Sequence, residues 1–321
     1  MNTYKNVYVT GSIAYDTIMD FPGEFKDYLH PEKLHQINIS FSVKKLEKQM
    51  GGTGTNIAYN IKHVTCNMKH SNVYLLGSIG KDGQEFMNFF KKNKIDVSGI
   101  VVDKHLYSSA GSVITDKKDN QIWGFYYGAS EKIPHTDFGK LNKKTDLLVI
   151  SANHKNSFLY FQKEAIKNKI SYFYDPGMTL TWIKGKDLEE GVLNCQYLIG
   201  NDYEIAMILK RLNVSINQLI DTGIHVITTL GEEGVQYYDV GAKRASPVFV
   251  KAFKVEKMID PTGAGDAWRG GFVAGLLMNY SIRDCLKLGN VMASFAIEKY
   301  GTVNHRPTKK EIEKRMERLK S

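Results

Sequence analysis

The residues of this sequence best suited to chemistry lie in one glycine-rich segment. It reads Asp260-Pro-Thr-Gly-Ala-Gly-Asp266 and leads directly into 267–277, a run of small and apolar residues typical of a buried helix. Because the first amides of a helix have no partner within it, the N–H groups of Ala264, Gly265 and Asp266 could converge on one anion. The glycines would let a phosphoryl group reach the backbone. Such a nest of amides stabilises the negative charge that develops on a transferred phosphate.

Asp266 stands in the first turn of that predicted helix, beside the nest. A carboxylate there could accept the proton of an alcohol while the amides hold a phosphate in line, and a general base contributes about 10²–10⁴-fold to a rate. The alternative is structural, because the helix dipole favours an acid in the first turn and glycines allow close packing. The segment taken alone favours neither interpretation. It matches neither the Walker A motif nor the glycine loop of protein kinases.

Three further segments and one aspartate could also bind a ligand. Their polar residues or glycines lie at the end of a predicted strand or at the start of a predicted helix. Each has a structural explanation as well: a turn before a helix, a capping box, a hairpin, or a plain turn aspartate. Asp16, after the first predicted strand, could instead grip two sugar hydroxyls. The segments are Gly51-Gly52-Thr53-Gly54-Thr55-Asn56, Asn201-Asp-Tyr-Glu204 and Thr229-Leu-Gly-Glu-Glu-Gly234.

The elements that must position these residues alternate between short β-rich apolar runs and stretches of helical periodicity. This alternation predicts βαβ units around a parallel sheet, and ligands bind at the carboxyl ends of the strands of such sheets. Strands are predicted at 6–12, 73–79, 147–152, 171–174, 197–200 and 225–230, and helices at 56–64, 85–94, 158–169, 203–212, 265–278 and 282–300.

Two long segments, 16–50 and 101–127, interrupt the alternation. The second predicts a hairpin in which 108–115 and 121–127 flank a polar turn. In the first, 35–43 alternates apolar and polar residues, which suggests a half-exposed strand. We therefore expect one core domain over 1–321 with a small β lid inserted from these two segments, because long excursions from compact domains are commonly lids.

Composition narrows the function classes. The chain has 321 residues, 42% of them hydrophobic, and a formal charge of +9. The lysines are spread along the sequence, and the dense stretch 309–320 alternates with glutamates like a solvated helix, so we expect no nucleic-acid partner. Apolar runs are too short to cross a bilayer, and no secretory signal precedes the first strand. Three scattered cysteines indicate neither a metal site nor a disulfide framework, and a reducing cytoplasm fits them. The histidines form no ligand spacing.

The motifs together resemble the ribokinase-like (PfkB) family of sugar and nucleoside kinases, in the usual order between positions 11 and 290. The resemblance implies a three-layer α/β/α sandwich with a mostly parallel sheet and an ATP-dependent kinase activity. It implies Asp266 as the catalytic base and Gly263 to Asp266 as the anion hole. Asp16 would bind sugar hydroxyls, and Gly51, Gly52 and Asn56 would form the substrate floor and the lid hinge.

The same resemblance implies sites for Mg-ATP and for a monovalent cation. Asn201 and Glu204 would organise Mg²⁺, its waters and the phosphates, since magnesium needs few carboxyl contacts. The remaining implied residues are Thr229, Gly231 and Gly234 beside ATP, Asn290 near adenine, and Asp260 and Thr262 near a K⁺ loop.

The acceptor is less clearly marked. The segments 11–16, 20–25, 37–41 and 124–129 resemble bacterial and archaeal nucleoside and adenosine kinases, although Tyr127 replaces a usual proline. Phe41 and Phe125 are candidate walls for a purine, or residues that pack the lid. We expect transfer to the 5′-hydroxyl of a ribonucleoside, adenosine first, in purine salvage. A sugar kinase acting on ribose or a phosphorylated hexose is the alternative, disfavoured because the lid has no arginine. A non-catalytic nucleotide sensor, and a monomer or a homodimer, are left open.

Overall fold

The computed structural model describes residues 3–29, 38–66, 68, 72–118, 120–134, 136–240 and 247–319, without the side chains of 121 and 123. Its main sheet has nine strands in the order β13-β12-β11-β10-β9-β8-β1-β4-β5. From β11 to β5 all neighbours are parallel, whereas β12 and β13 form an antiparallel edge. The strands are β1 (Asn6–Thr10), β4 (Asn72–Ile79), β5 (Asp96–Val102), β8 (Asp146–Ser151), β9 (Tyr172–Asp175), β10 (Tyr197–Asn201), β11 (His225–Thr229), β12 (Gly234–Tyr238) and β13 (Val248–Lys251).

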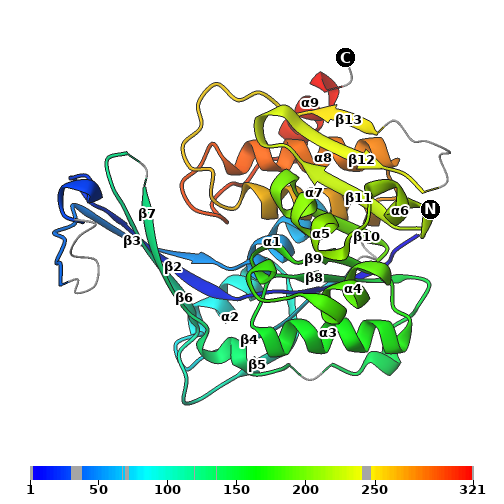
Figure 1. Cartoon of the computed structure of the whole chain (residues 1–321), viewed down its shortest axis with the longest axis horizontal. Helices are drawn as coiled ribbons and strands as arrows, with labels where there is room; N and C mark the ends of the chain where they lie inside the picture. Colours follow the sequence, from blue (N-terminus) through cyan, green and yellow to red (C-terminus); the bar gives the residue numbers. More distant parts are fainter. Residues whose placement is uncertain are drawn as a thin grey trace.

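Side chains of the sheet alternate between two apolar cores, as the pleat of a strand requires. In β8, for example, Leu147 and Val149 enter one core while Leu148 and Ile150 enter the other. Helices cover both faces of the sheet, so the molecule has three layers, α/β/α, as expected (Figure 1). One face carries α1 (Thr53–Val64), α2 (Gln84–Lys92), α7 (Ala264–Leu277), α8 (Ile282–Ala296) and α9 (Lys309–Arg318), and the other carries α3 (Lys155–Asn168), α4 (Gly185–Leu193), α5 (Asp202–Leu212) and α6 (Ile216–Asp221).

A second sheet of four strands, in the order β3-β2-β6-β7, projects from the body (Figure 1). Its strands are β2 (Ala14–Asp20), β3 (Lys45–Gly51), β6 (Ser109–Thr115) and β7 (Gln121–Tyr126). The expected hairpin forms as the antiparallel pair β6–β7. Short 3-10 helices occur at Phe25–Asp27, Gly128–Glu131, Phe138–Lys140, Gly177–Thr181 and Gly231–Glu233.

The strand expected at 35–43 is wrong for the part that is described. Residues 35–37 lie outside the described residues, 38–43 contain no strand, and β3 begins at Lys45. Phe41 explains the difference, because its ring packs among those of Phe21, Phe25 and Tyr28 at the far end of the second sheet. The alternation at 38–43 therefore reflects a local aromatic cluster and not a paired strand.

Candidate active site

The start of α7 has the geometry of an anion site. Gly263 caps the helix with φ +77°, and a Cβ at this position would lie 2.8 Å from the Thr302 side chain, so both conformation and space require glycine. The Ala264 amide donates to the Pro261 carbonyl at 3.2 Å and is therefore occupied, contrary to our expectation of three free amides. Within the described residues, no acceptor is found for the amides of Gly265 and Asp266, and these two remain available to an anion.

Asp266 is half-buried and held by a residue from the other end of the chain. Asn56 Nδ2 donates to Asp266 Oδ2 at 2.8 Å, and Thr302 Oγ1 lies 2.8 Å from Asn56 Oδ1. Because Thr302 donates to Oδ1, the amide of Asn56 is oriented with its NH₂ group toward the carboxylate. Burial raises the pKa of Asp266 to about 6, while the charge of Arg269 and the bond from Asn56 oppose the rise. A carboxylate with this pKa is a suitable general base near neutral pH.

Asp16 lies on β2 and points to the same space as Asp266. Its Oδ2 occupies the position that a side chain of Gly51 would need, since a Cβ there would come within 1.9 Å. Burial raises the pKa of Asp16 to about 7, and the charges of Asp266 and Asp260 add to the effect. Gly52 has φ +87°, and a Cβ on it would lie 2.4 Å from the Ser12 carbonyl oxygen. The two glycines thus let β3 and α1 close tightly around the Asp16 carboxylate.

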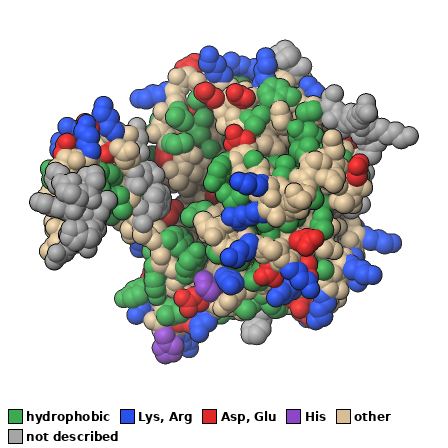
Figure 2. Space-filling view, in the orientation of Figure 1, with side chains coloured by type: hydrophobic (Ala, Val, Ile, Leu, Met, Phe, Trp, Pro, Cys, Tyr) green, Lys and Arg blue, Asp and Glu red, His purple; other side chains and the backbone are tan. Residues whose placement is uncertain are grey.

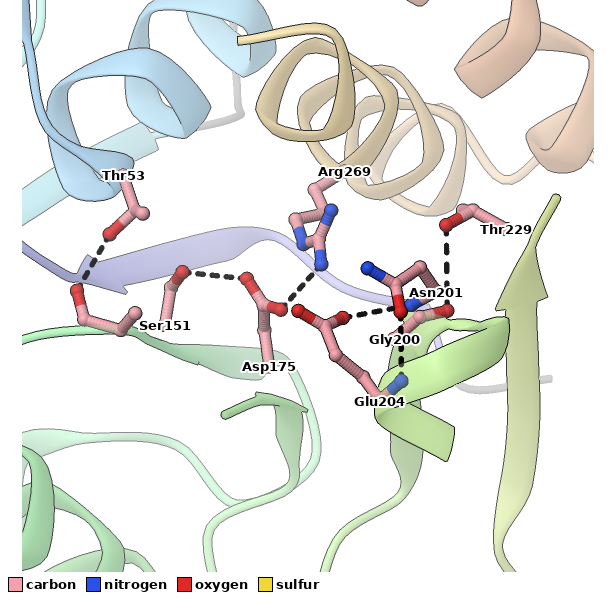
Figure 3. A network of polar contacts seen from close by, with 9 residues as sticks. Thr53, Ser151, Asp175, Gly200, Asn201, Glu204, Thr229 and Arg269 are labelled. Carbon is pink, nitrogen blue, oxygen red and sulfur yellow. Dashed lines mark hydrogen bonds and ion pairs between the residues drawn. The ribbon is translucent and has the colours of Figure 1, made fainter. Parts of the chain in front are cut away.

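Asn201 and Glu204 form a complete capping box at the start of α5, as the spacing suggested (Figure 3). Glu204 Oε2 accepts from the Asn201 amide and Asn201 Oδ1 accepts from the Glu204 amide, each at 2.8 Å. Burial raises the pKa of Glu204. The second oxygen, Oε1, faces Gly177 at the carboxyl end of β9, 4.0 Å from where a Cβ would stand. The structural and the phosphate-binding interpretations of this motif are therefore compatible.

In the turn after β11, Gly234 is tightly packed whereas Gly231 has open space beside it. Thr229 Oγ1 donates to the Gly200 carbonyl at 3.4 Å and so joins the ends of β11 and β10 (Figure 3). Gly234 has φ +124°, and a Cβ there would lie 2.1 Å from the Val250 carbonyl oxygen, which is a structural requirement. Gly231, at φ +57°, would meet nothing within 4 Å.

A buried ion pair near the anion site was not anticipated from the sequence. Arg269, one turn after Asp266, donates from Nη2 to Asp175 Oδ1 at 2.6 Å, and Ser151 Oγ donates to Asp175 Oδ2 at 2.6 Å (Figure 3). Although burial opposes its charge, Asp175 holds the pKa of Arg269 above its ordinary value. The signal in the sequence is a single cation within the apolar helix 267–277.

Asn290 and Phe41 are both held by contacts with other elements. Asn290 is 5% exposed; it accepts from Trp268 Nε1 at 2.7 Å and donates to the carbonyls of Val250 and Lys251 at 3.1 and 2.8 Å. These bonds engage both ends of its amide and tie α7, α8 and β13 together. Phe41 packs against Phe21 at the far end of the second sheet, four residues before β3 begins at Lys45.

Phe125, in contrast, lies in register with Asp16. Across the second sheet the row runs Gln49, Asp16, Gly111, Phe125, so these side chains share one face. The Phe125 ring is 42% exposed and touches Tyr127, with ring centroids 5.0 Å apart. Glycine between the acid and the ring leaves the middle of this row without a side chain.

Asp260 links the two loops beside the anion site. Its Oδ1 accepts from the Thr262 amide at 2.9 Å and its Oδ2 from the Gly301 amide at 3.0 Å. Thr262 itself is exposed. The described residues contain no cluster of three or more His, Cys, Asp or Glu side chains that would bind a metal directly.

The loop 300–304 also contacts the projecting sheet through β3. Thr302 Oγ1 lies 3.0 Å from the Met50 carbonyl oxygen, Asn304 Nδ2 donates to Gln49 Oε1 at 2.9 Å, and Lys45 Nζ stands 4.2 Å from the ring centre of Tyr300. On the face shown in Figure 2, the molecule is hollowed between this sheet and the body. The site therefore lies between the body and the projecting sheet, and the loop 300–304 contacts β3 of that sheet.

Comparison with known proteins decides the family. The model of the pfkB family carbohydrate kinases matches residues 16–309. The chain belongs to this family. Its activity is accordingly that of an ATP-dependent phosphotransferase with an alcohol acceptor, and the resemblance and fold inferred from the sequence are confirmed.

The similar family members include nucleoside kinases and ribokinases. The chain is 28% identical to the nucleoside kinases of Methanocaldococcus jannaschii, over 91% of this chain and 94% of the relative, and of Methanothermobacter thermautotrophicus, over 98% and 96%. The solved Burkholderia thailandensis nucleoside kinase in complex with inosine has a TM-score of 0.84 at 26% identity and covers 98% of both chains. The same enzyme, solved in complex with ADP-inosine, has a TM-score of 0.80. No helix within the described ranges is long and apolar enough to span a membrane.

Proposed function

We propose that this kinase transfers the γ-phosphate of ATP to the 5′-hydroxyl of a purine ribonucleoside, with adenosine preferred. The observation that carries the proposal is the row in which Asp16 and Phe125 flank Gly111 on one face of the second sheet. Adjacent strands are about 4.8 Å apart, so the acid and the ring are separated by roughly 10 Å. A ribonucleoside laid along this row would place its ribose hydroxyls on Asp16 and its base against Phe125.

At the 5′-hydroxyl end of the acceptor, residues at the start of α7 would carry out the phosphoryl transfer. Asp266 would take the proton of the 5′-hydroxyl as that oxygen bonds to the γ-phosphorus and the bond to the β,γ-bridging oxygen of ATP breaks. The amides of Gly265 and Asp266 would stabilise the charge on the phosphoryl oxygens in transit. The products are the nucleoside 5′-phosphate and ADP, with the proton on Asp266.

Magnesium fits the residues present, because Glu204 keeps one carboxylate oxygen without a described donor and Mg²⁺ prefers to retain water and bind phosphates. Glu204 and Asn201 would hold the hydrated ion, which would neutralise phosphate charge.

Asp260 and Thr262 would lie beside a monovalent cation. Because both Asp260 oxygens already accept amides, this part of the proposal is tested separately, by comparing turnover in KCl with turnover in choline chloride.

Three relatives support a nucleoside over a simple sugar, since they are nucleoside kinases and one was solved with inosine, whereas the ribokinases among the relatives are the basis of the sugar alternative. A sugar alone would have no base to stack on Phe125, and the lid contains no arginine to clamp a sugar phosphate. The three free cysteines, two of them buried, suit the reducing cytoplasm in which we place the reaction.

An ATP-consumption screen over nucleosides and simple sugars tests the proposal. We expect adenosine or another purine ribonucleoside to give the highest kcat/KM, and ribose to be at least about 10-fold poorer, because base stacking contributes about 1–3 kcal/mol. Ribose or a hexose as the best acceptor would overturn it.

The second sheet is proposed to close as a lid over the bound acceptor. Hydrogen exchange in 38–51 and 109–126 should slow when the acceptor binds, and unchanged exchange would reject the lid.

A further inference from the structure

Arg269 occupies a position that ordinary helix packing does not explain. It is 8% exposed and lies in α7 among residues that are otherwise small or apolar from 267 to 277. Burying a guanidinium is costly, and a buried ion pair is often no more stable than apolar residues of similar size. The pair with Asp175 therefore calls for a reason beyond stability.

Most of the hydrogen-bonding capacity of Arg269 is unused by the protein. A guanidinium has five N–H groups, and the structure pairs Nη2 with Asp175. Nε is buried without an acceptor among the described residues. Nη1 lies beside Gly265, whose amide is part of the anion site, because a Cβ built on that residue would come within 2.8 Å of Nη1. Long side chains on a helix lean toward its N-terminus, which is how Arg269 reaches back under the first turn.

The guanidinium also lies between the two halves of the proposed phosphate site. From α7 it reaches toward the end of β9, which carries Asp175, and the start of α5, which carries Glu204 (Figure 3). On the α7 side its charge acts on Asp266, and on the sheet side it acts on Glu204. A phosphoryl group bound by the amides of Gly265 and Asp266 would therefore lie near Nη1 of the guanidinium, for which the described residues give no acceptor.

We propose that Arg269 is a further catalytic residue, whose unpaired N–H groups donate to the phosphoryl group as it passes from ATP to the acceptor. The inference rests on the proposed phosphoryl transfer but not on the identity of the acceptor. Asp175 and Ser151 hold the guanidinium in place, so no reorganisation is needed when charge develops. The electron pairs move as in the transfer described above, and Arg269 neither gains nor loses a proton.

Removing Arg269 alone would leave Asp175 as a buried unpaired charge and could unfold the chain. The decisive variant is therefore the double substitution Arg269→Met with Asp175→Asn, in which the whole ion pair is removed. We expect its thermal midpoint to match that of the wild type and its kcat to fall about 10²–10³-fold, the usual effect of losing one donor to a developing oxyanion. ADP affinity should change less than about threefold, whereas inhibition by ADP with aluminium fluoride, a mimic of the transferring phosphoryl group, should weaken as much as kcat.

Arg269→Lys is the matched control if the double variant is unstable. It keeps the charge and can still reach Asp175, but it loses the planar fork. We expect an unchanged thermal midpoint and a lower kcat. Turnover within threefold of wild type in either variant would overturn the proposal. So would equal losses of ADP affinity and kcat, since uniform binding does not accelerate the transfer. If the screen finds a sugar acceptor instead of a nucleoside, the proposed function fails. The Arg269 variants are then compared with wild type using that sugar, so the role of Arg269 is tested independently.

Discussion

Asn56 and Asp266 are 210 positions apart in the chain, yet Asn56 Nδ2 donates to Asp266 Oδ2 at 2.8 Å. The bond joins α1 to α7 across the centre of the site. It orients one carboxylate oxygen and leaves Oδ1 for the acceptor hydroxyl. The amide of Asn56 also favours the charged form of Asp266, which is the form that acts as a base.

Asp266→Asn should lower kcat by about 10²–10⁴-fold, because the amide cannot accept the hydroxyl proton. ATP affinity should stay within about threefold of wild type, since the amides of Gly265 and residue 266 remain. Turnover assays and calorimetric titration with ATP measure the two effects. Retained turnover would reject the base assignment, and an unchanged thermal midpoint is the control for folding.

Thr302→Val should lower kcat about 3–10-fold, because one hydrogen bond, worth about 0.5–1.5 kcal/mol, no longer orients Asn56. A loosely held Asn56 stabilises the carboxylate less, so the pKa of Asp266 should rise and the acid limb of kcat should move to higher pH. Thr302→Ser, which keeps the hydroxyl, should restore both. A valine variant with the wild-type pH profile would show that Thr302 only fills space.

The pH dependence of turnover should separate the two aspartates. Burial sets the pKa of Asp16 to about 7 and that of Asp266 to about 6, and both must be charged to act. Thus kcat/KM for the acceptor should fall as the pH drops below about 7, with a steeper fall below about 6. Because Asp16 stays ionised while the acceptor is bound, kcat should fall only below about pH 6, where Asp266 is protonated. A kcat/KM that is flat from pH 8 to pH 5 would contradict both assignments.

Asp16→Asn should raise the acceptor KM about 10–100-fold, since hydrogen bonds to a charged group contribute about 1.5–3 kcal/mol. The same variant should be more stable than wild type at pH 8. The raised pKa means that the folded chain favours the protonated form, so stability is lost as the pH rises through about 7 and is fully present near pH 4. The free energy of unfolding should increase by up to about 4 kcal/mol at pH 8, since each pH unit between 3.8 and about 7 is worth about 1.4 kcal/mol, and much less at pH 4. Asp20→Asn, at the exposed end of β2, is the control and should alter neither quantity.

Phe125→Ala should raise the KM for a nucleoside about 10–100-fold, because stacking on an aromatic ring is worth about 1–3 kcal/mol per base. The KM for ribose, if it is accepted at all, should not change. Ile122→Ala, in the same strand but on the opposite face of the sheet, provides the matched control. Equal effects of Phe125→Ala on nucleoside and sugar would remove Phe125 from the base site.

The local features of the site were predictable because short-range physics sets them. Gly263 adopts a left-handed conformation to start α7, and the spacing of Asn201 and Glu204 builds a capping box, both of which are visible in the sequence. The engaged amide of Ala264 was missed, since the turn formed by Pro261 depends on the exact backbone path. Helix α8 was predicted to run to 300 but ends at Ala296, because the Ile297 carbonyl accepts the amides of Ile259 and Asp260 from another loop.

Long-range contacts were the part that a single sequence could not supply. Nothing in the spacing places Thr302 against Asn56, or Arg269 against Asp175. Phe41 and Phe125 had the same local character, and only the pairing of the strands separates a residue that packs the far end of the sheet from one in register with Asp16. Asn290 looked available because its partners, Trp268 and the carbonyls of β13, come from other elements.

The tie between Thr302 and Asn56 has a consequence for synthesis of the protein. A ribosome that has released the first 290 residues has already delivered the phosphate-binding turns and the base, but not the loop that aligns Asn56 or the contacts that anchor β3. Unfinished chains would thus hold ATP-binding parts without an aligned base. If Asp266 is the base, as proposed, consumption of ATP would begin only when the final stretch has folded back onto the first helix.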